Sequence, residues 1–318
     1  MKDSYDRKIN YLRLSVTDRC NLRCKYCMPE SGISKKTHHD ILRHEEMIKI
    51  VKISAALGIE KVRLTGGEPL IRRGIVDLVR DIKQVEGIKE LTMTTNGVLL
   101  GDMLDDLIDA GLDRINLSLD TLNPDRYRSI TRGGELQPIL KCIDRILEKK
   151  MKLKINVVLI GGLNIDEIKD FVDLTRNHPI DVRFIELMPI GEASLWSHDK
   201  FVSGQKVLEM VDLKPIESEE TGSPAKYYKL ADGKGKVGLI NPISCSFCEN
   251  CNRIRITSDG KIKPCLHSDS EIDLLKLLRN NEDVESTIKE AIWDKPKAHS
   301  LNDEDHVPIK REMIQIGG

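Results

Sequence analysis

The chain has 318 residues, which is enough to bury a large core in one large domain or two ordinary ones. Hydrophobic residues make up 40% and charged residues 32%, with a formal net charge of −1, so the composition is that of a soluble globular protein and disfavours a globally basic nucleic-acid binder. The charged residues 1–6 and the lack of a long apolar run predict neither a secretory signal nor a membrane span. We therefore expect a cytoplasmic protein, in which cysteines are more typical of metal sites than of disulfides. Seven of the eight cysteines fall in two groups, at residues 20–27 and 245–265, and Cys142 is expected to be a core residue.

The first predicted strand, residues 12–16, leads into a loop that carries Cys20, Cys24 and Cys27. Thiolates that converge from one short loop are ligands for a soft metal centre. A closed structural zinc site takes four protein ligands, whereas three cysteines on a four-iron cluster leave one iron open. The alternative is three unrelated buried cysteines, which are common in protein cores.

From residue 11 to about 186, short β-branched runs alternate with longer amphipathic segments. The other predicted strands are residues 61–64, 91–94, 114–119, 152–160 and 182–185. The predicted helices are residues 44–57, 75–85, 103–109, 136–149 and 165–177, with a further turn of helix opened by Asn123 and Pro124. Six such alternations imply a parallel sheet with right-handed crossovers. Because no G-x-G-x-x-G follows the first strand, an incomplete (β/α)6 TIM-like barrel is favoured over a Rossmann sheet.

Polar and glycine-rich turns follow several of these strands, where a barrel carries its functional groups. Gly66 and Gly67 follow the second strand and would let the backbone approach a ligand closely. Next to them, the Glu68 carboxylate is expected to accept hydrogen bonds from an ammonium group. Ser118 ends the fourth strand, and Met188 follows the sixth. Each turn alone is ordinary, but their register with one metal loop favours a common site.

The C-x3-C-x2-C spacing, the Gly-Gly-Glu-Pro segment and Ser118 together resemble the radical S-adenosylmethionine (SAM) superfamily. The resemblance implies a partial (β/α)6 barrel that holds a four-iron cluster. It also implies that the open iron of this cluster is chelated by the amino and carboxylate groups of SAM. It also implies that Tyr26 touches SAM, that Gly67 faces its amino group, that Ser118 faces the ribose and that Met188 faces the adenine.

A second region follows a link with several glycines, and we place the domain boundary between residues 1–215 and residues 216–318. Residues 225–230 and 236–240 are expected to form a hairpin. A second hairpin over residues 254–265, turned at Asp259 and Gly260, would return Cys265 towards Cys248 and Cys251.

Two cysteines three apart, joined by one that a hairpin returns, are a strong metal signal. A zinc ribbon is the main alternative to a second iron–sulfur cluster, because Cys245 could complete a four-thiolate set. Arg253 and Arg255 favour the cluster, since alternate residues of a strand share one face. Two guanidinium groups on that face suit the capture of a phosphate chain, although solvated surface arginines would show the same spacing.

The C-x2-C-x-R-x-R pattern with its returning cysteine resembles the C-terminal region of the GTP 3′,8-cyclase family, whose members open molybdenum cofactor biosynthesis. The resemblance runs from Arg13 to the terminal Gly317 and Gly318. Cys245 departs from the family pattern. If it bound the fourth iron, that cluster could not hold GTP as the family does, and we expect Cys245 to be a bystander.

This resemblance implies a radical SAM lyase that converts GTP to (8S)-3′,8-cyclo-7,8-dihydroguanosine 5′-triphosphate, using SAM and two [4Fe–4S] clusters. A 5′-deoxyadenosyl radical removes the 3′ hydrogen of the ribose, and the carbon radical attacks carbon 8 of guanine. The implied cluster ligands are Cys20, Cys24, Cys27, Cys248, Cys251 and Cys265. The implied GTP contacts are Arg13, Arg63, Thr94, Lys154, Arg253 and Arg255. The implied catalytic residues are Arg253, Arg255, Gly317 and Gly318.

The resemblance also implies an electron donor of the ferredoxin or flavodoxin kind, a downstream cyclic pyranopterin monophosphate synthase and a homodimer, with neither nucleic acid nor membrane as a partner. One rival is a peptide-modifying radical SAM enzyme with an auxiliary cluster. A second is a non-enzymatic iron–sulfur or zinc protein, which would not need the residues at the strand ends.

Overall fold

One sheet runs through the molecule, for which the computed structural model describes residues 1–318 except 35, 197, 218–221, 302–308 and 318. Its strands in these residues are β1 (Tyr11–Ser15), β2 (Lys61–Thr65), β3 (Glu90–Thr95), β4 (Arg114–Ser118), β5 (Lys152–Leu159), β6 (Asp181–Glu186), β7 (Lys214–Ile216), β8 (Ala225–Lys229), β9 (Lys236–Ile240), β10 (Arg253–Ile256), β11 (Lys261–Lys263) and β12 (Ile272–Asp273). The spatial order is β12-β11-β10-β1-β2-β3-β4-β5-β6-β9-β8-β7, with β1 to β6 as parallel neighbours. The described sheet is therefore open, and the predicted incomplete barrel is confirmed.

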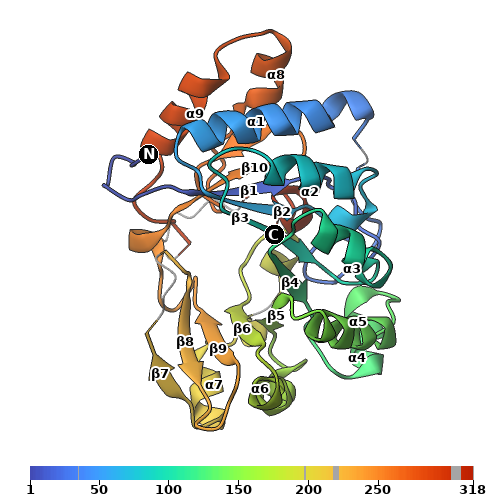
Figure 1. The fold of residues 1–318 in the computed structure, drawn as a ribbon. Helices are drawn as coiled ribbons and strands as arrows, with labels where there is room; N and C mark the ends of the chain where they lie inside the picture. The colour runs from blue at the N-terminus through green and yellow to red at the C-terminus, as the bar shows by residue number, and fades with distance from the viewer. Residues whose placement is uncertain (35, 197, 218–221, 302–308, 318) are drawn as a thin grey trace.

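The helices lie mainly on the outside of the parallel strands (Figure 1). They are α1 (His44–Ala56), α2 (Ile75–Lys83), α3 (Leu100–Asp109), α4 (Pro124–Thr131), α5 (Gln137–Glu148), α6 (Ile168–Asn177), α7 (Gln205–Met210), α8 (Leu274–Arg279) and α9 (Val284–Trp293). Helix α4 begins where Asn123 accepts hydrogen bonds from the backbone N–H groups of Asp125 and Arg126. Pro124 occupies the first helical position, where its missing N–H costs nothing.

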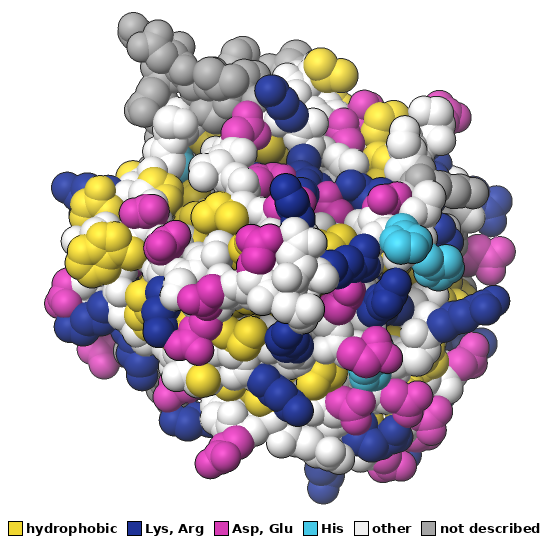
Figure 2. Space-filling model, turned by 90° about the horizontal axis from the view of Figure 1, so that it is seen from above, with side chains coloured by type: hydrophobic (Ala, Val, Ile, Leu, Met, Phe, Trp, Pro, Cys, Tyr) yellow, Lys and Arg dark blue, Asp and Glu magenta, His cyan; other side chains and the backbone are white. Residues whose placement is uncertain are grey.

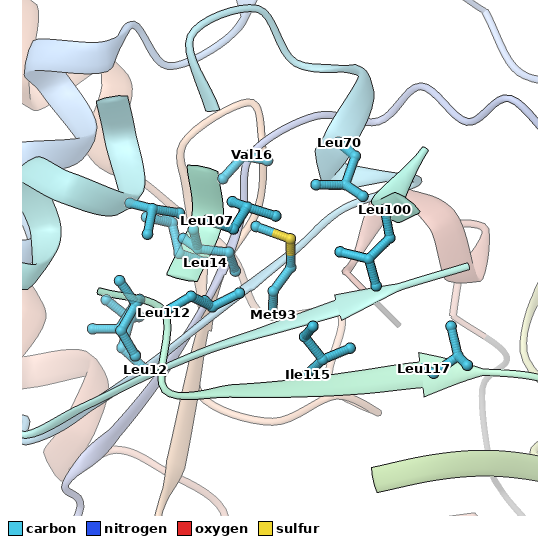
Figure 3. Packing of buried hydrophobic residues seen from close by; sticks show 14 of the residues in the cluster. Leu12, Leu14, Val16, Leu70, Met93, Leu100, Leu107, Leu112, Ile115 and Leu117 are labelled. Carbon is cyan, nitrogen blue, oxygen red and sulfur yellow. The ribbon is translucent and has the colours of Figure 1, made fainter. Parts of the chain in front are cut away.

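The two faces of the parallel strands carry different residues. Leu12 and Leu14 of β1 are fully buried towards the helices, and Figure 3 shows Leu14 beside Met93 of β3 and Leu107 of α3. Between them, Arg13 points to the opposite face, in register with Arg63 of β2. Most parallel strands are apolar on both faces. This polar alternation indicates that the inner face of the barrel surrounds something charged.

The predicted elements agree with the structure to within three residues at their ends. The six predicted strands and five predicted helices are present. The largest differences are at α3, which begins at Leu100 rather than at residue 103, and at α6, which begins at Ile168 rather than at residue 165. Both hairpins are confirmed, as β8 with β9 and β10 with β11. Helices α7, α8 and α9 escaped prediction, although Asp273 and Asp283 cap the first turns of α8 and α9.

The C-terminal third of the chain extends the barrel sheet at both edges. Strand β10 pairs in parallel with β1, and β9 pairs in parallel with β6. The described end of the tail, at Gly317, lies against Arg13 of β1 and Arg255 of β10. Cys248, Cys251 and Cys265 line one cavity together with these two arginines.

Candidate active site

The loop with Cys20, Cys24 and Cys27 is held by the end of helix α4. The N–H groups of Arg23 and Lys25 donate to the carbonyls of Thr131 and Ile130, at 3.1 and 3.0 Å. The next residue after the helix, Arg132, donates from one guanidinium nitrogen to two carbonyls of the same loop, those of Arg23 and Met28. These contacts hold the loop on either side of Cys24 and directly after Cys27.

The three thiols of this loop interact with one another. Burial and then the neighbouring Cys20 raise the pKa of Cys27 to about 12. Burial and then Cys27 raise the pKa of Cys24 well above its usual value. Clustered thiolates repel one another unless a cation compensates them, so the donor set fits a soft, positively charged metal centre.

Two of the predicted SAM contacts line a small cavity of about 30 Å³ beside this loop. Tyr26 and Ser118 share its wall with Cys24. The Tyr26 hydroxyl donates to Asp120 Oδ2 at 2.7 Å, and the backbone N–H of Val158 donates to Asp120 Oδ1. Burial raises the pKa of Asp120 to about 6. Asp120, which the sequence analysis did not select, orients the Tyr26 ring.

The paired glycines after β2 pack against the start of the cysteine loop. A Cβ at Gly67 would lie 2.2 Å from the carbonyl oxygen of Arg19, and one at Gly66 would lie 2.4 Å from that of Thr17. The Gly67 N–H donates to the Thr17 carbonyl at 2.8 Å. Only glycine permits this close approach, so these residues seat the cysteine loop on the sheet.

The expectation for Glu68 is wrong. Its carboxylate is fully buried, with Oε1 accepting from the Leu70 N–H and the Thr95 hydroxyl and Oε2 accepting from the Asn96 N–H. Burial raises the pKa of Glu68 to about 7. Glu68 therefore braces the loop after β2 against the loop after β3, instead of facing a ligand.

The second cysteine group opens onto the main cavity, which has a volume of about 190 Å³. Cys248, Cys251 and Cys265 all line it. Cys245 is exposed, lies outside the cavity lining and accepts a contact from Lys226 Nζ at 3.2 Å. All eight cysteines are free thiols, and no three His, Cys, Asp or Glu side chains in the described part of the chain surround a single-ion position.

Four of the predicted GTP contacts line this same cavity, namely Arg13, Arg63, Arg253 and Arg255. Burial, with the charges of Arg255 and Arg63, lowers the pKa of Arg13 well below its usual value. Burial and Arg253 lower the pKa of Arg255 to about 10. Crowded guanidinium groups in a closed space are stabilised by an anion with several charges.

Arg253 also faces the second cysteine group. Its Nη2 lies 3.7 Å from Cys251 Sγ, and its guanidinium carbon lies 5.0 Å from the centre of the Phe247 ring. Burial acts to raise the pKa of Cys251, but Arg253 and Lys295 outweigh it and bring that pKa to about 6. The thiolate needed for metal binding is thus favoured at Cys251.

The C-terminal tail runs between the two cysteine groups. The backbone of Ile314 lies close enough to the Cys27 thiol to lower its pKa, against the larger effect of burial. The Gly317 carbonyl accepts from Arg13 Nη2 and from Arg255 Nη1, both at 3.1 Å. Met188 packs against the buried Ile316 of the tail and also lines the main cavity. Gly318 lies outside the described residues.

Two predicted GTP contacts lie apart from the cavity lining. Lys154 Nζ donates to the Tyr227 hydroxyl at 3.0 Å and lies 3.3 Å from Asp181 Oδ2. Thr94 lies on the inner face of β3, opposite Asn116, and its buried hydroxyl has no hydrogen-bond partner in the described residues. The structure thus brings these two near the barrel interior but not onto the cavity wall.

The sequence analysis missed other cavity-lining residues, including Tyr11, Lys61, Asn156 and Arg183. Arg183 is 5% exposed and donates to Asn116 Oδ1 at 2.7 Å. A signal was available, because Arg183 is the third residue of β6 just as Arg13 and Arg63 are the third residues of β1 and β2.

Two family models match the chain, the radical SAM superfamily over residues 14–175 and Molybdenum Cofactor Synthesis C over residues 180–301. A GTP 3′,8-cyclase of Alkaliphilus oremlandii is 54% identical over 321 residues and covers 100% of both chains. Another, of Peptoclostridium acidaminophilum, is 56% identical over 319 residues, 99% of this chain and 98% of its own. This chain belongs to the GTP 3′,8-cyclase family.

Members of this family share the radical SAM fold with distant structures. The structure of Streptococcus suis SuiB bound to S-adenosylmethionine has a TM-score of 0.62 and 15% identity, over 97% of this chain and 76% of SuiB. That likeness shows the fold alone. Membership of the superfamily brings one [4Fe–4S] cluster and SAM, and the crowded thiols of Cys20, Cys24 and Cys27 fit such a cluster.

The surface of this family member carries charges of both signs. Figure 2 shows Lys and Arg side chains interspersed with Asp and Glu over the face seen from above, in keeping with the net charge of −1. None of the helices in the described ranges is long and apolar enough to cross a membrane. A concentration of Arg and Lys side chains instead lines the main cavity.

Proposed function

We propose that this chain is a GTP 3′,8-cyclase that converts GTP to (8S)-3′,8-cyclo-7,8-dihydroguanosine 5′-triphosphate, the first step of molybdenum cofactor biosynthesis. The observation that carries the proposal is the main cavity, which is lined by three cysteines and five arginines. The thiols suit a soft metal centre, and the guanidinium groups suit a triphosphate. The high identity to cyclases over the full length of both chains supports the same assignment.

In this proposal, Cys20, Cys24 and Cys27 hold the first [4Fe–4S] cluster. Bound there, the cluster and SAM supply the radical chemistry that joins carbon 3′ of the GTP ribose to carbon 8 of guanine. The chain's own residues place SAM, with Tyr26 and Ser118 on the wall of the small cavity beside Cys24. Asp120 keeps the Tyr26 ring in place, and Gly67 shapes the floor under the loop.

In this proposal, Cys248, Cys251 and Cys265 would hold a second [4Fe–4S] cluster, which would bind the guanine base. Cys245 takes no part, which is supported by its exposure outside the cavity lining. The zinc-ribbon alternative needs a fourth thiolate, and Cys245 is the remaining cysteine of this group. Three thiols on the cavity wall therefore favour a cluster with an open position.

GTP binds in the main cavity with its triphosphate against the arginines of the cavity wall. Arg13, Arg63, Arg253 and Arg255 neutralise the phosphate oxygens and position the substrate. Met188, the proposed contact to the adenine of SAM, also lies on the wall of this cavity. Lys154 and Thr94 remain proposed contacts that GTP would reach deeper in the barrel, and Gly317 and Gly318 remain proposed catalytic residues.

The proposal is tested by one anaerobic assay with reductant, SAM and GTP. We expect 5′-deoxyadenosine to form in a GTP-dependent manner, together with the 3′,8-cyclised nucleotide detected by mass spectrometry. Cys24→Ala should abolish both products, whereas Cys142→Ala, which alters a buried core thiol outside both groups, should leave both at the parental level. The proposal would be overturned if the rate of SAM cleavage did not depend on GTP. It would also be overturned if the protein bound zinc in place of iron.

The remaining partners follow from this chemistry. The reaction needs a low-potential electron donor, for which a ferredoxin or flavodoxin is the proposed source, and its product needs a cyclic pyranopterin monophosphate synthase downstream. A homodimer and a cytoplasmic location complete the proposal. Size-exclusion chromatography with light scattering would test the dimer.

A further inference from the structure

Arg7, which precedes the barrel, uses its whole guanidinium group to hold main-chain segments together. Its Nε donates to Asp3 Oδ2 at 2.6 Å. Nη1 donates to the carbonyls of Cys248 and Lys297, at 2.8 and 2.9 Å, and Nη2 donates to those of Pro296 and Lys295, at 2.7 and 3.3 Å. Arginine has five N–H donors, and here each has an acceptor.

The segments that Arg7 joins both lead to the second cysteine group. One contact is the carbonyl of Cys248 itself. The other three carbonyls belong to residues 295–297, and the Lys295 side chain, which is 3% exposed, donates to the carbonyl of Pro264. Pro264 directly precedes Cys265. Arg7 therefore links the segment of Cys248 to the segment of Cys265 through Lys295.

The charge of Arg7 is balanced within the same turn. Arg7 is 9% exposed and Asp3 is 2% exposed, and Asp3 Oδ1 also accepts from the backbone N–H groups of Tyr5 and Arg7. Breaking a buried, hydrogen-bonded pair is costly because the remaining charge loses its partner. A Lys at position 7 would keep the charge but offer three donors from one point instead of a planar fork of five.

We propose that Arg7 is a positioning residue for the auxiliary cluster, which fixes Cys248 and Cys265 at the spacing that cluster binding requires, with Asp3 orienting its guanidinium group. This inference rests on the proposed function, since it takes Cys248, Cys251 and Cys265 as cluster ligands. Arg7 does not line the GTP cavity, so it acts through the ligand segments. Changes to residues that support metal ligands commonly weaken metal binding about 10- to 100-fold.

The experiment compares Arg7→Gln and Arg7→Lys with the parent in a background where Cys20, Cys24 and Cys27 are all Ala, so that the second cluster is the sole EPR-active centre expected. We expect Arg7→Gln to lower iron content and the cluster EPR signal about tenfold after mild chelation. Arg7→Lys should recover part of the loss. Lys2→Ala is the matched control, because it breaks an exposed ion pair with Asp6 in the same segment and should leave the signal unchanged.

The full chain with all its cysteines gives the second readout. There, the Arg7→Gln variant should retain the first cluster and should still cleave SAM slowly in the absence of GTP. It should no longer form the GTP-dependent cyclised product. Parental iron and EPR signal in Arg7→Gln would overturn the inference while leaving the proposed function intact. A parent protein that holds no second cluster would instead overturn the function.

A further variant covers the case in which Arg7→Gln does not fold. Asp3→Asn keeps Arg7 and its four carbonyl contacts but removes the charge that orients the guanidinium group. We expect a smaller loss of second-cluster iron than in Arg7→Gln, with the iron of the first cluster retained. Loss of both clusters in equal measure would show a general folding role and overturn the inference.

Discussion

At the scale of single residues, two guanidinium groups share one acceptor in the centre of the molecule. Arg13 and Arg255 both donate to the Gly317 carbonyl. Burial and the charges of neighbouring arginines lower the pKa of both groups. A triphosphate carries several negative charges and suits several guanidinium groups at once. In the proposed complex, the tail carbonyl and GTP therefore contact the same arginines.

Arg253→Ala should separate SAM cleavage from cyclisation. Arg253 lies on the cavity wall and within 3.7 Å of Cys251 Sγ, but the first cysteine loop contacts other residues. We expect loss of the cyclised product by at least about 100-fold, as is common when a charge-stabilising contact is removed, while slow, uncoupled 5′-deoxyadenosine formation persists. Both products are measured by liquid chromatography. Loss of SAM cleavage as well would indicate a structural role for Arg253.

Gly317→Ala should displace the tail from the arginines. Gly317 has a φ of +71°, and an added Cβ would lie 2.5 Å from the Thr65 hydroxyl oxygen. The variant must move the carbonyl away from Arg13 and Arg255, so we expect a KM for GTP or a kcat altered about tenfold without a change in iron content. Gly133→Ala is the control, because Gly133 also has a positive φ but no atom within 4 Å of the added Cβ. Equal effects of both substitutions on activity would contradict this explanation.

The sequence alone was enough to identify functional residues that lie a few positions apart in the chain. The two cysteine groups and the Arg253 and Arg255 pair were found because short intervals fix which side chains meet. Arg183 was missed because its inward direction depends on the register of β6 with β5, in which it lies opposite Asn156. The role of Glu68 was misjudged, since its three donors come from two separate loops that only the fold brings together.

At the scale of elements, the loops after β2 and β3 are joined by one buried carboxyl group. Glu68 accepts from Thr95 and Asn96 across that gap, and Asn96 in turn donates to Asn21 Oδ1 at 2.8 Å, next to Cys20. The brace therefore reaches the first cysteine loop. Alternation of strands and helices predicted the sheet that carries these loops, but contacts between successive loops depend on side-chain geometry that periodicity does not encode.

Glu68→Gln should change how stability depends on pH. Because burial raises the pKa of Glu68 from 4.5 to about 7, the folded parent binds a proton that the unfolded chain has lost. Its contribution to stability is complete below about pH 4.5 and disappears as pH rises through 7, a change on the order of 3 kcal/mol. The glutamine side chain does not titrate, so the stability of the variant does not fall with pH for this reason. We therefore expect the parent's advantage in unfolding free energy to shrink between pH 5 and pH 8.

Denaturant unfolding under anaerobic conditions measures this difference at each pH. Glu86→Gln is the control, since Glu86 is exposed on the surface and should give a difference that does not vary with pH. A parent-to-variant gap for Glu68 that stays constant from pH 5 to pH 8 would refute the buried, protonated state.

At the scale of the whole molecule, the C-terminal third completes the sheet that the first two thirds begin. Strand β10 covers the free edge of β1, and β9 covers the free edge of β6. The buried residues Ile254 and Ile256 of β10 belong to the same core as Leu12 and Leu14 of β1. The two matched sequence families, residues 14–175 and 180–301, are therefore parts of one sheet in the structure.

A fragment of residues 1–216, which keeps β7 whole, should not fold by itself. It would expose the edges of β1 and β6 to solvent, and unpaired parallel edges beside an apolar core favour aggregation. We expect insoluble or molten material with no cooperative thermal transition, and recovery of a cooperative transition when residues 217–318 are co-expressed as a separate chain. Circular dichroism and limited proteolysis measure both. A soluble fragment that unfolds cooperatively and retains iron on Cys20, Cys24 and Cys27 would instead show that the barrel is independent, with the C-terminal strands added to a finished domain.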